Sequence, residues 1–140
     1  MNVFFDVDDT ILCGLDGTLR PHVADVFARI RADGHSIYVW SSAGRRWGDL
    51  ERHGLHTFVS ECYLKPDGDH ERTLRVQSVV EPHFVIDDHP DIVGVFGGCQ
   101  VRPYLEPDAG DTEMLRVYDA FCDFVRFGSS RKKRMTEPAR

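Results

Sequence analysis

Two aspartates one residue apart follow an apolar run near the start of the chain. Asp6 and Asp8 lie in the sequence VFFDVDDT. Side chains alternate along a strand, so both carboxylates would leave the same face at its carboxyl end. Two anions this close repel each other unless a cation or a shared proton separates them. Oxygen ligands favour a hard divalent ion such as Mg²⁺, so the pair predicts a metal site. The run alone also fits a polar turn in which Asp9 and Thr10 cap the next element.

Polar side chains also end the three later apolar runs that we expect to be strands. They are Ser41 after Ile37–Trp40, Lys65 after Thr57–Leu64, and Asp87 with Asp88 after Phe84–Ile86. In a parallel sheet, the carboxyl ends of the strands meet at one edge, where ligands bind. The sequence therefore predicts that carboxylates, a hydroxyl and an amine share one crevice. For Lys65 taken alone, an ordinary surface lysine is an equally good interpretation.

The elements that must position these residues alternate between short apolar strands and helices. A further strand is predicted over 99–101, and residues 12–20 suit a loop or small hairpin. Helices are predicted from Pro21 to Gly34, over 43–53 and over 71–80, and a last one begins at Asp111 or Thr112. Short apolar strands separated by helices predict an α/β fold, a Rossmann-like three-layer α/β/α sandwich with about five parallel strands. In the last helix the predicted apolar face consists of Leu115, Tyr118, Phe121, Cys122 and Val125.

Composition is typical of one compact domain. The chain has 140 residues, 41% of them hydrophobic, so we expect a single domain over 1–128. Five of the 17 basic residues but one of the 23 acidic residues lie in 131–140, so 129–140 is a basic tail. Such a tail could bind nucleic acid, although a short terminal charge run is more often a solvated, disordered end.

The sequence also bears on location and on the cysteines. No signal-peptide pattern or long apolar span is visible, so we expect a cytoplasmic protein without membrane contact. The four cysteines are widely spaced, which favours free structural thiols and leaves zinc as a remote alternative. They are Cys13, Cys62, Cys99 and Cys122.

In this order, the residues resemble the haloacid dehalogenase superfamily of aspartyl-phosphate phosphotransferases. The D-x-D-x-T run resembles its first motif, and Ser41 its second. Lys65-Pro66 is similar to its third motif, and Asp87-Asp88 to its fourth. Each motif alone is weak, but four in register over residues 2–100 are specific. A receiver domain also has clustered acids and a Lys-Pro, but there the acidic pair comes first.

The resemblance implies a phosphatase. Asp6 would be the nucleophile that forms an aspartyl-phosphate, and Asp8 the general acid and base. Mg²⁺ would be held by Asp6, the backbone carbonyl of Asp8, and Asp87. Lys65 and Ser41 would bind the phosphoryl oxygens. Asp88 and Asp91 are candidates for orienting the waters of the metal. An acid at position 8 favours phosphatases over the dehalogenases of this superfamily.

The spacing between the motifs leaves no room for a large cap domain. Similar uncapped proteins act on macromolecular ends or phosphoproteins, or borrow a lid from a neighbouring subunit. The resemblance is therefore also compatible with a homo-oligomer. Ser42 could replace Ser41 if the second strand is one residue longer. Arg45 and Arg46 could bind a second phosphate, or could be exposed helical arginines. Two alternatives to the hydrolase remain: a non-catalytic protein that binds Mg²⁺ or a phosphorylated partner, and a polynucleotide-end phosphatase that uses the basic tail.

Overall fold

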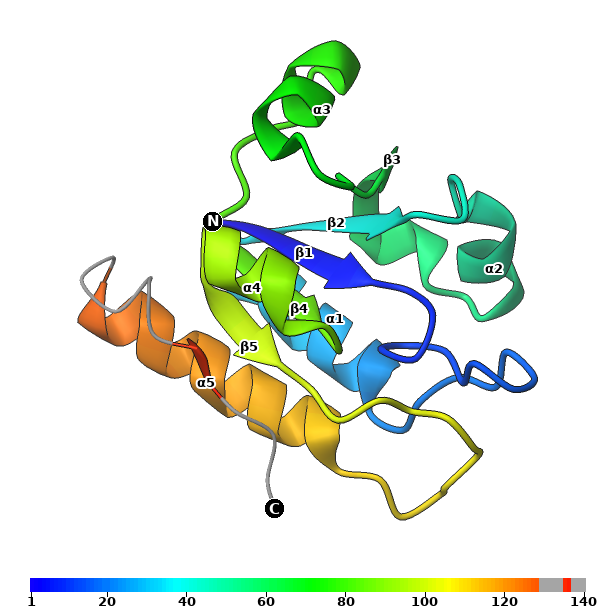
Figure 1. Ribbon diagram of the computed structural model, residues 1–140. Helices are drawn as coiled ribbons and strands as arrows, with labels where there is room; N and C mark the ends of the chain where they lie inside the picture. The colour runs from blue at the N-terminus through cyan, green and yellow to red at the C-terminus, as the bar shows by residue number, and fades with distance from the viewer. Residues whose placement is uncertain (129–134, 137–140) are drawn as a thin grey trace.

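A parallel sheet forms the middle layer of the fold. The computed structural model describes residues 1–128 and 135–136. The strand order is β3-β2-β1-β4-β5-β6, and all five pairings of neighbouring strands are parallel (Figure 1). The strands are β1 (Asn2–Asp6), β2 (Ser36–Ser41), β3 (Val59–Leu64), β4 (Phe84–Asp87), β5 (Gly98–Gln100) and β6 (Met135–Thr136).

Helices cover both faces of the sheet, and alternation along β1 shows how. Val3 and Phe5 pack into one apolar cluster with α1 and α5, whereas Phe4 points the other way into a second cluster with Ile92 and Val93 of α4. This is the three-layer arrangement predicted from the sequence. The helices are α1 (Val23–Ala32), α2 (Trp47–Arg52), α3 (His70–Gln77), α4 (Pro90–Phe96) and α5 (Glu113–Phe127), with a short 3₁₀ turn η1 (His56–Phe58) before β3.

The order of the strands creates a switch point between β1 and β4. From β1 the chain continues outward through β2 and β3 on one side, whereas β4 is followed by β5 on the other. The loops after β1 and β4 therefore diverge and leave a crevice at the carboxyl edge, which is the usual ligand site of such sheets. The aspartates of the first and last motifs lie at this point.

The predictions for the 43–53 helix and for the buried face of the last helix need correction, and one helix was missed. The predicted 43–53 helix begins only at Trp47, because the Ser41 hydroxyl accepts the Ala43 amide at 3.1 Å and Gly44 has a φ of 116°. No helix was predicted over 90–96, where α4 is short and begins at Pro90. In α5 the buried side is a neighbouring stripe, of which only Phe121 was predicted. Its buried members are Glu113, Met114, Val117, Phe121 and Phe124, while Leu115, Cys122 and Val125 are exposed.

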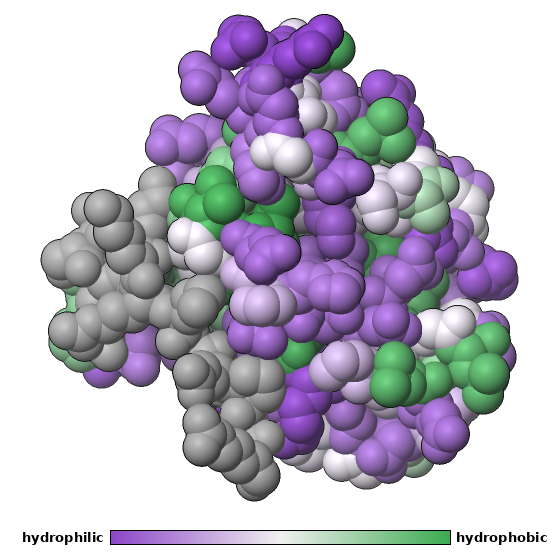
Figure 2. Space-filling model, in the orientation of Figure 1, coloured by the Kyte–Doolittle hydropathy of each residue, from purple (hydrophilic) through white to green (hydrophobic). Residues whose placement is uncertain are grey.

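Other expectations have mixed outcomes. Between residues 1 and 128 no cap domain is inserted, as predicted. No helix in the described part of the chain is long and apolar enough to cross a membrane. All four cysteines are free, and three of them are buried. The two-residue β6 was not predicted, and the rest of the basic tail, 129–134 and 137–140, lies outside the described residues. The hydrophilic surface shown in Figure 2 carries its apolar residues in small, separate groups.

Candidate active site

A tight turn after β1 sets the direction of the first two motif aspartates. The Val7 carbonyl accepts hydrogen bonds from the amides of Thr10, Ile11 and Leu12 at 3.2, 3.0 and 3.1 Å. Asp9 has a φ of 63°, a left-handed conformation that aspartate tolerates better than most residues. The turn folds Thr10 back toward Asp6, so these two side chains meet at the carboxyl end of the strand.

Three buried carboxylates meet at the switch point. Asp6, Asp87 and Asp88 are 4%, 0% and 8% exposed, and one oxygen of each lies within 4.8 Å of those of the others. The Thr10 hydroxyl contacts Asp6 Oδ2 at 3.0 Å and Asp88 Oδ1 at 3.2 Å. Lys65 Nζ donates to Asp6 Oδ1 and to Asp87 Oδ2, both at 3.1 Å. We refer to Asp6, Asp87 and Asp88 as the carboxylate trio.

Burial disfavours the ionised form of Asp6 and Asp87. It raises the pKa of Asp6, and the nearby Asp87 carboxylate raises it further, while Lys65 opposes the rise. Burial raises the pKa of Asp87 as well, against the opposing effect of Lys65. For Lys65, burial lowers the pKa, but the two carboxylates outweigh burial and the net pKa is raised. One ammonium group is thus too little positive charge for this site.

The donor set fits a hard divalent cation. With all three carboxylates ionised and Lys65 protonated, the site carries two surplus negative charges, which one divalent ion would neutralise. The ligands are oxygens from aspartate, which favour Mg²⁺, Ca²⁺ or Mn²⁺ over softer metals. Among the described residues, the cluster of candidate ligands includes no cysteine or histidine, which argues against the zinc alternative. Asp88 belongs to the same group of candidate ligands as Asp6 and Asp87, whereas the sequence predicts for it a role in orienting metal-bound water.

Asp8 is not a member of the trio and pairs with Arg46. The guanidinium binds both carboxylate oxygens, with Nη1–Oδ2 at 2.7 Å and Nη2–Oδ1 at 3.0 Å. The Asp8 side chain is 50% exposed, whereas that of Arg46 is 17% exposed. Arg46 is held in turn by Asp49, whose Oδ2 lies 2.6 Å from Nε. Each Asp8 oxygen therefore accepts a hydrogen bond from Arg46, and the two bonds fix the orientation of the carboxylate.

Ser41 lies beside this pair at the end of β2. Its hydroxyl oxygen accepts from the Ala43 amide and from Arg46 Nη1, at 3.1 and 3.2 Å, which leaves the hydroxyl hydrogen to donate to a ligand. The Lys65 amide donates to the Ser41 carbonyl at 3.1 Å, so the second and third motifs are joined directly. Ser42 and Arg45 are both exposed, and it is Arg46 that the structure brings to Asp8 and Ser41.

A cavity of about 430 Å³ opens next to Lys65. Asp91, which the sequence analysis proposed to orient metal-bound water, lies on its wall at the start of α4. Two imidazoles, those of His70 and His89, line the same space. The cavity opens to solvent, so a ligand bound at Lys65 could extend through it. The full lining is Ser42, Lys65, Pro66, Asp67, Gly68, His70, His89, Asp91 and Ile92.

Two contacts in the site were not predicted from the sequence. Thr10 was assigned to a motif but given no partner, although its hydroxyl joins two members of the trio. Arg46 was noted beside Arg45 as an arginine that could bind an acidic group on a ligand, but its pairing with Asp8 was not foreseen. The position of an arginine so soon after Ser41 was the one available signal, and it could not distinguish the two neighbours.

Comparisons with known proteins leave the function open. No known protein family matches the sequence, and no curated protein matches it either. Among solved structures, the fold is similar to the crystal structure of an uncharacterized protein from Listeria monocytogenes serotype 4b. The two share 9% sequence identity with a TM-score of 0.59, over 90% of this chain and 99% of the other. At this identity the likeness bears on the α/β fold alone.

Proposed function

We propose that this protein is a Mg²⁺-dependent phosphomonoester hydrolase that works through an aspartyl-phosphate. The observation that carries the proposal is the buried carboxylate trio with Lys65 between Asp6 and Asp87 at the switch point of the sheet. Burying surplus negative charge is costly for a fold and is typical of sites that bind cations and act on anions. The resemblance of the motifs to the haloacid dehalogenase superfamily supports the same reaction.

In the proposed reaction, an Asp6 oxygen attacks phosphorus and the bond to the leaving oxygen breaks. Asp8 gives its proton to that oxygen, so the products are an alcohol and an acyl phosphate on Asp6. Water, deprotonated by Asp8, then attacks phosphorus and restores Asp6 with release of inorganic phosphate. Mg²⁺ held by the trio would supply positive charge to both reactants. Lys65 and the Ser41 hydroxyl would bind the phosphoryl oxygens.

The open cavity bears on the substrate. Without a cap over residues 1–128, nothing in the described chain closes over a ligand at Lys65. The proposal therefore includes both phosphorylated small molecules and phosphorylated macromolecular ends. The cytoplasmic location expected from the sequence and a lid borrowed from a second subunit both stay predictions.

The pairing of Asp8 with Arg46 favours a second candidate, a protein that binds Mg²⁺ or a phosphorylated partner without turnover. A carboxylate bound through both oxygens to one guanidinium is held in place by two charge-assisted hydrogen bonds and is not free to turn toward a leaving group. If that contact never opens, the site can bind but cannot hydrolyse. The two candidates differ only in turnover, so an activity measurement separates them.

The test is phosphate release from sugar phosphates, nucleotides, phosphopeptides and oligonucleotide ends, with Mg²⁺ or with EDTA. We expect Mg²⁺-dependent release that Asp6→Asn abolishes, because the amide cannot act as the nucleophile. Asp123→Asn is the matched control, since Asp123 is exposed on α5 away from the trio. Release that persists in Asp6→Asn would refute the proposed nucleophile. Mg²⁺ binding by calorimetry with no release from any substrate would favour the binding protein.

A further inference from the structure

A buried arginine outside the motifs contacts the turn that carries them. Arg20 is 1% exposed. Its Nε and Nη2 bind the two oxygens of Asp111 at 2.8 and 2.9 Å, and its Nη1 donates to the Thr10 carbonyl at 3.1 Å. Its guanidinium also lies 5.0 Å from the centre of the Tyr104 ring. The sequence analysis had assigned Arg20 no role, because it ends a loop without a recognisable motif.

Thr10 separates Arg20 from the carboxylate trio. Arg20 holds the carbonyl of Thr10, and the hydroxyl of the same residue contacts Asp6 and Asp88. The backbone of this turn is fixed on two further sides. The Arg20 amide donates to the Ile11 carbonyl at 2.8 Å, and the Tyr104 amide donates to the Asp9 carbonyl at 2.7 Å. These bonds fix the backbone position from which the Thr10 hydroxyl reaches the two carboxylates.

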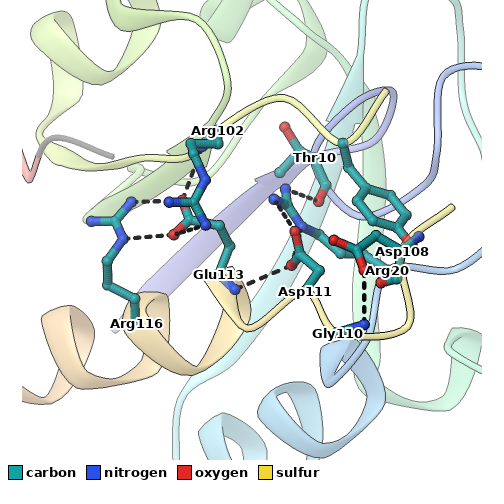
Figure 3. A network of polar contacts seen from close by, with 9 residues as sticks. Thr10, Arg20, Arg102, Asp108, Gly110, Asp111, Glu113 and Arg116 are labelled. Atoms are coloured by element: carbon teal, nitrogen blue, oxygen red, sulfur yellow. Dashed lines mark hydrogen bonds and ion pairs between the residues drawn. The ribbon is translucent and has the colours of Figure 1, made fainter. Parts of the chain in front are cut away.

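The anchor of Arg20 continues into α5, as Figure 3 shows. Asp111 Oδ1 accepts from the Glu113 amide at 3.1 Å. The Glu113 carboxylate in turn binds Arg116, with Oε2–Nη2 at 3.0 Å, and accepts the Arg102 amide at 2.9 Å. A polar network therefore runs from the first turn of α5 to the loop after β1. Because Asp111 is fixed by the helix, the guanidinium fork is fixed too, and its third donor meets the Thr10 carbonyl at a defined angle.

We propose that Arg20 is a positioning residue for the trio and acts through Thr10. A buried ion pair adds little net stability compared with apolar packing, so a buried arginine here calls for a geometric reason. Contacts one step removed from metal ligands set the orientation of those ligands, and removing them typically costs about 10–100-fold in metal affinity or activity. Arg20 acts one step further out, through the Thr10 backbone, so its effect belongs at the lower end of that range. This inference rests on the proposed function in one respect: the orientation matters because the trio binds Mg²⁺.

Arg20→Lys tests the inference, because lysine can keep the ion pair with Asp111 but lacks the planar fork that also reaches Thr10. We expect Mg²⁺ affinity, measured by calorimetry on metal-free protein, to fall about 10-fold. The value of kcat should fall by a similar factor, with KM changed far less. Asp111→Asn, which weakens the anchor without removing Arg20, should show the same pattern and serves if Arg20→Lys does not fold. Arg102→Gln is the matched control, since Arg102 meets Glu113 in the same network but the Thr10 carbonyl is bound by Arg20.

Two results would overturn the inference. One is a folded Arg20→Lys protein with wild-type Mg²⁺ affinity and kcat, which would make Arg20 a structural residue only. The other is an equal loss in Arg102→Gln, which would assign the effect to the network in general. A wild-type protein that binds Mg²⁺ without turnover refutes the hydrolase and leaves the calorimetry to decide the role of Arg20. A wild-type protein that does neither refutes both proposals.

Discussion

Replacing Lys65 by methionine removes the positive charge that the trio contacts directly. The Lys65 side chain is 14% exposed, and its two partners Asp6 and Asp87 are 6% and 0% exposed, so water replaces little of the lost interaction. Breaking a buried ion pair by removing one partner typically costs about 3–5 kcal/mol. Because burial raises the pKa values of both carboxylates, protonation relieves part of the loss at low pH. The destabilisation should therefore be larger at pH 8 than at pH 5.

Urea denaturation in EDTA measures this loss. We expect Lys65→Met to lose about 3–5 kcal/mol of unfolding free energy at pH 8, and Mg²⁺ to recover more of it than the same Mg²⁺ adds to wild type. A ligand at 100 times its Kd adds about 2.7 kcal/mol to a folded protein. The control is Arg75→Met on α3, where the ion pair with Glu71 is 67% and 89% exposed and is worth at most about 0.5 kcal/mol. Equal losses in the two variants would refute the electrostatic description of the site.

Four more substitutions have expected outcomes. Between pH 5 and pH 8 in EDTA, the unfolding free energy of Asp6→Asn should fall less than that of wild type. The pKa of Asp6 is raised in the folded protein, so ionisation of Asp6 destabilises the wild-type fold as the pH rises. Equal falls in the two proteins, measured by denaturation, would contradict this. Glu113→Gln should cost about 3 kcal/mol at pH 7. Burial raises the pKa of Glu113, but its arginine partners lower it more. The stability difference between Glu113→Gln and wild type should therefore shrink as the pH falls below about 4. Melting curves of both proteins at pH 7 and pH 3 test this. Gly98→Ala should lower the unfolding free energy by about 3 kcal/mol, since a Cβ there would collide with the Val85 carbonyl of the paired strand. Gly48→Ala in α2 has open space around it and should raise the unfolding free energy by about 0.5–1 kcal/mol.

The centre of the sheet could be predicted from the sequence because β1, β2 and β4 are short apolar runs that end in a polar residue. That rule alone brought Asp6, Ser41, Lys65 and Asp87 to one edge, where the structure also has them. Strand ends are a property of the local chain, and the parallel topology then determines that they converge. Their convergence at one edge could therefore be predicted without knowing which side chains contact one another.

Side-chain partners across the fold could not be predicted in the same way. Asp8 was expected to face the same site as Asp6, but it pairs with Arg46 in the loop before α2. In α5 the sequence offers two neighbouring apolar stripes, and only packing against α1 and the sheet decides that Met114 and Val117 are buried while Leu115 is exposed. The pairing of Arg20 with Asp111 joins residues 91 positions apart, which no local pattern indicates.

The helix α3, whose first residue His70 lines the cavity, makes few contacts with the rest of the fold. None of the described residues of α3 is buried, and Figure 1 shows the helix standing off the edge of the sheet at β3. Gln77 ties it to Leu64 through two hydrogen bonds of 2.8 and 2.9 Å, while the Leu74 side chain packs against the apolar cluster on that face. Local opening of so small a contact requires far less free energy than global unfolding. The segment from Pro66 to His70 can therefore shift and widen the cavity for ligands of different size, while Lys65 stays bound to Asp6 and Asp87.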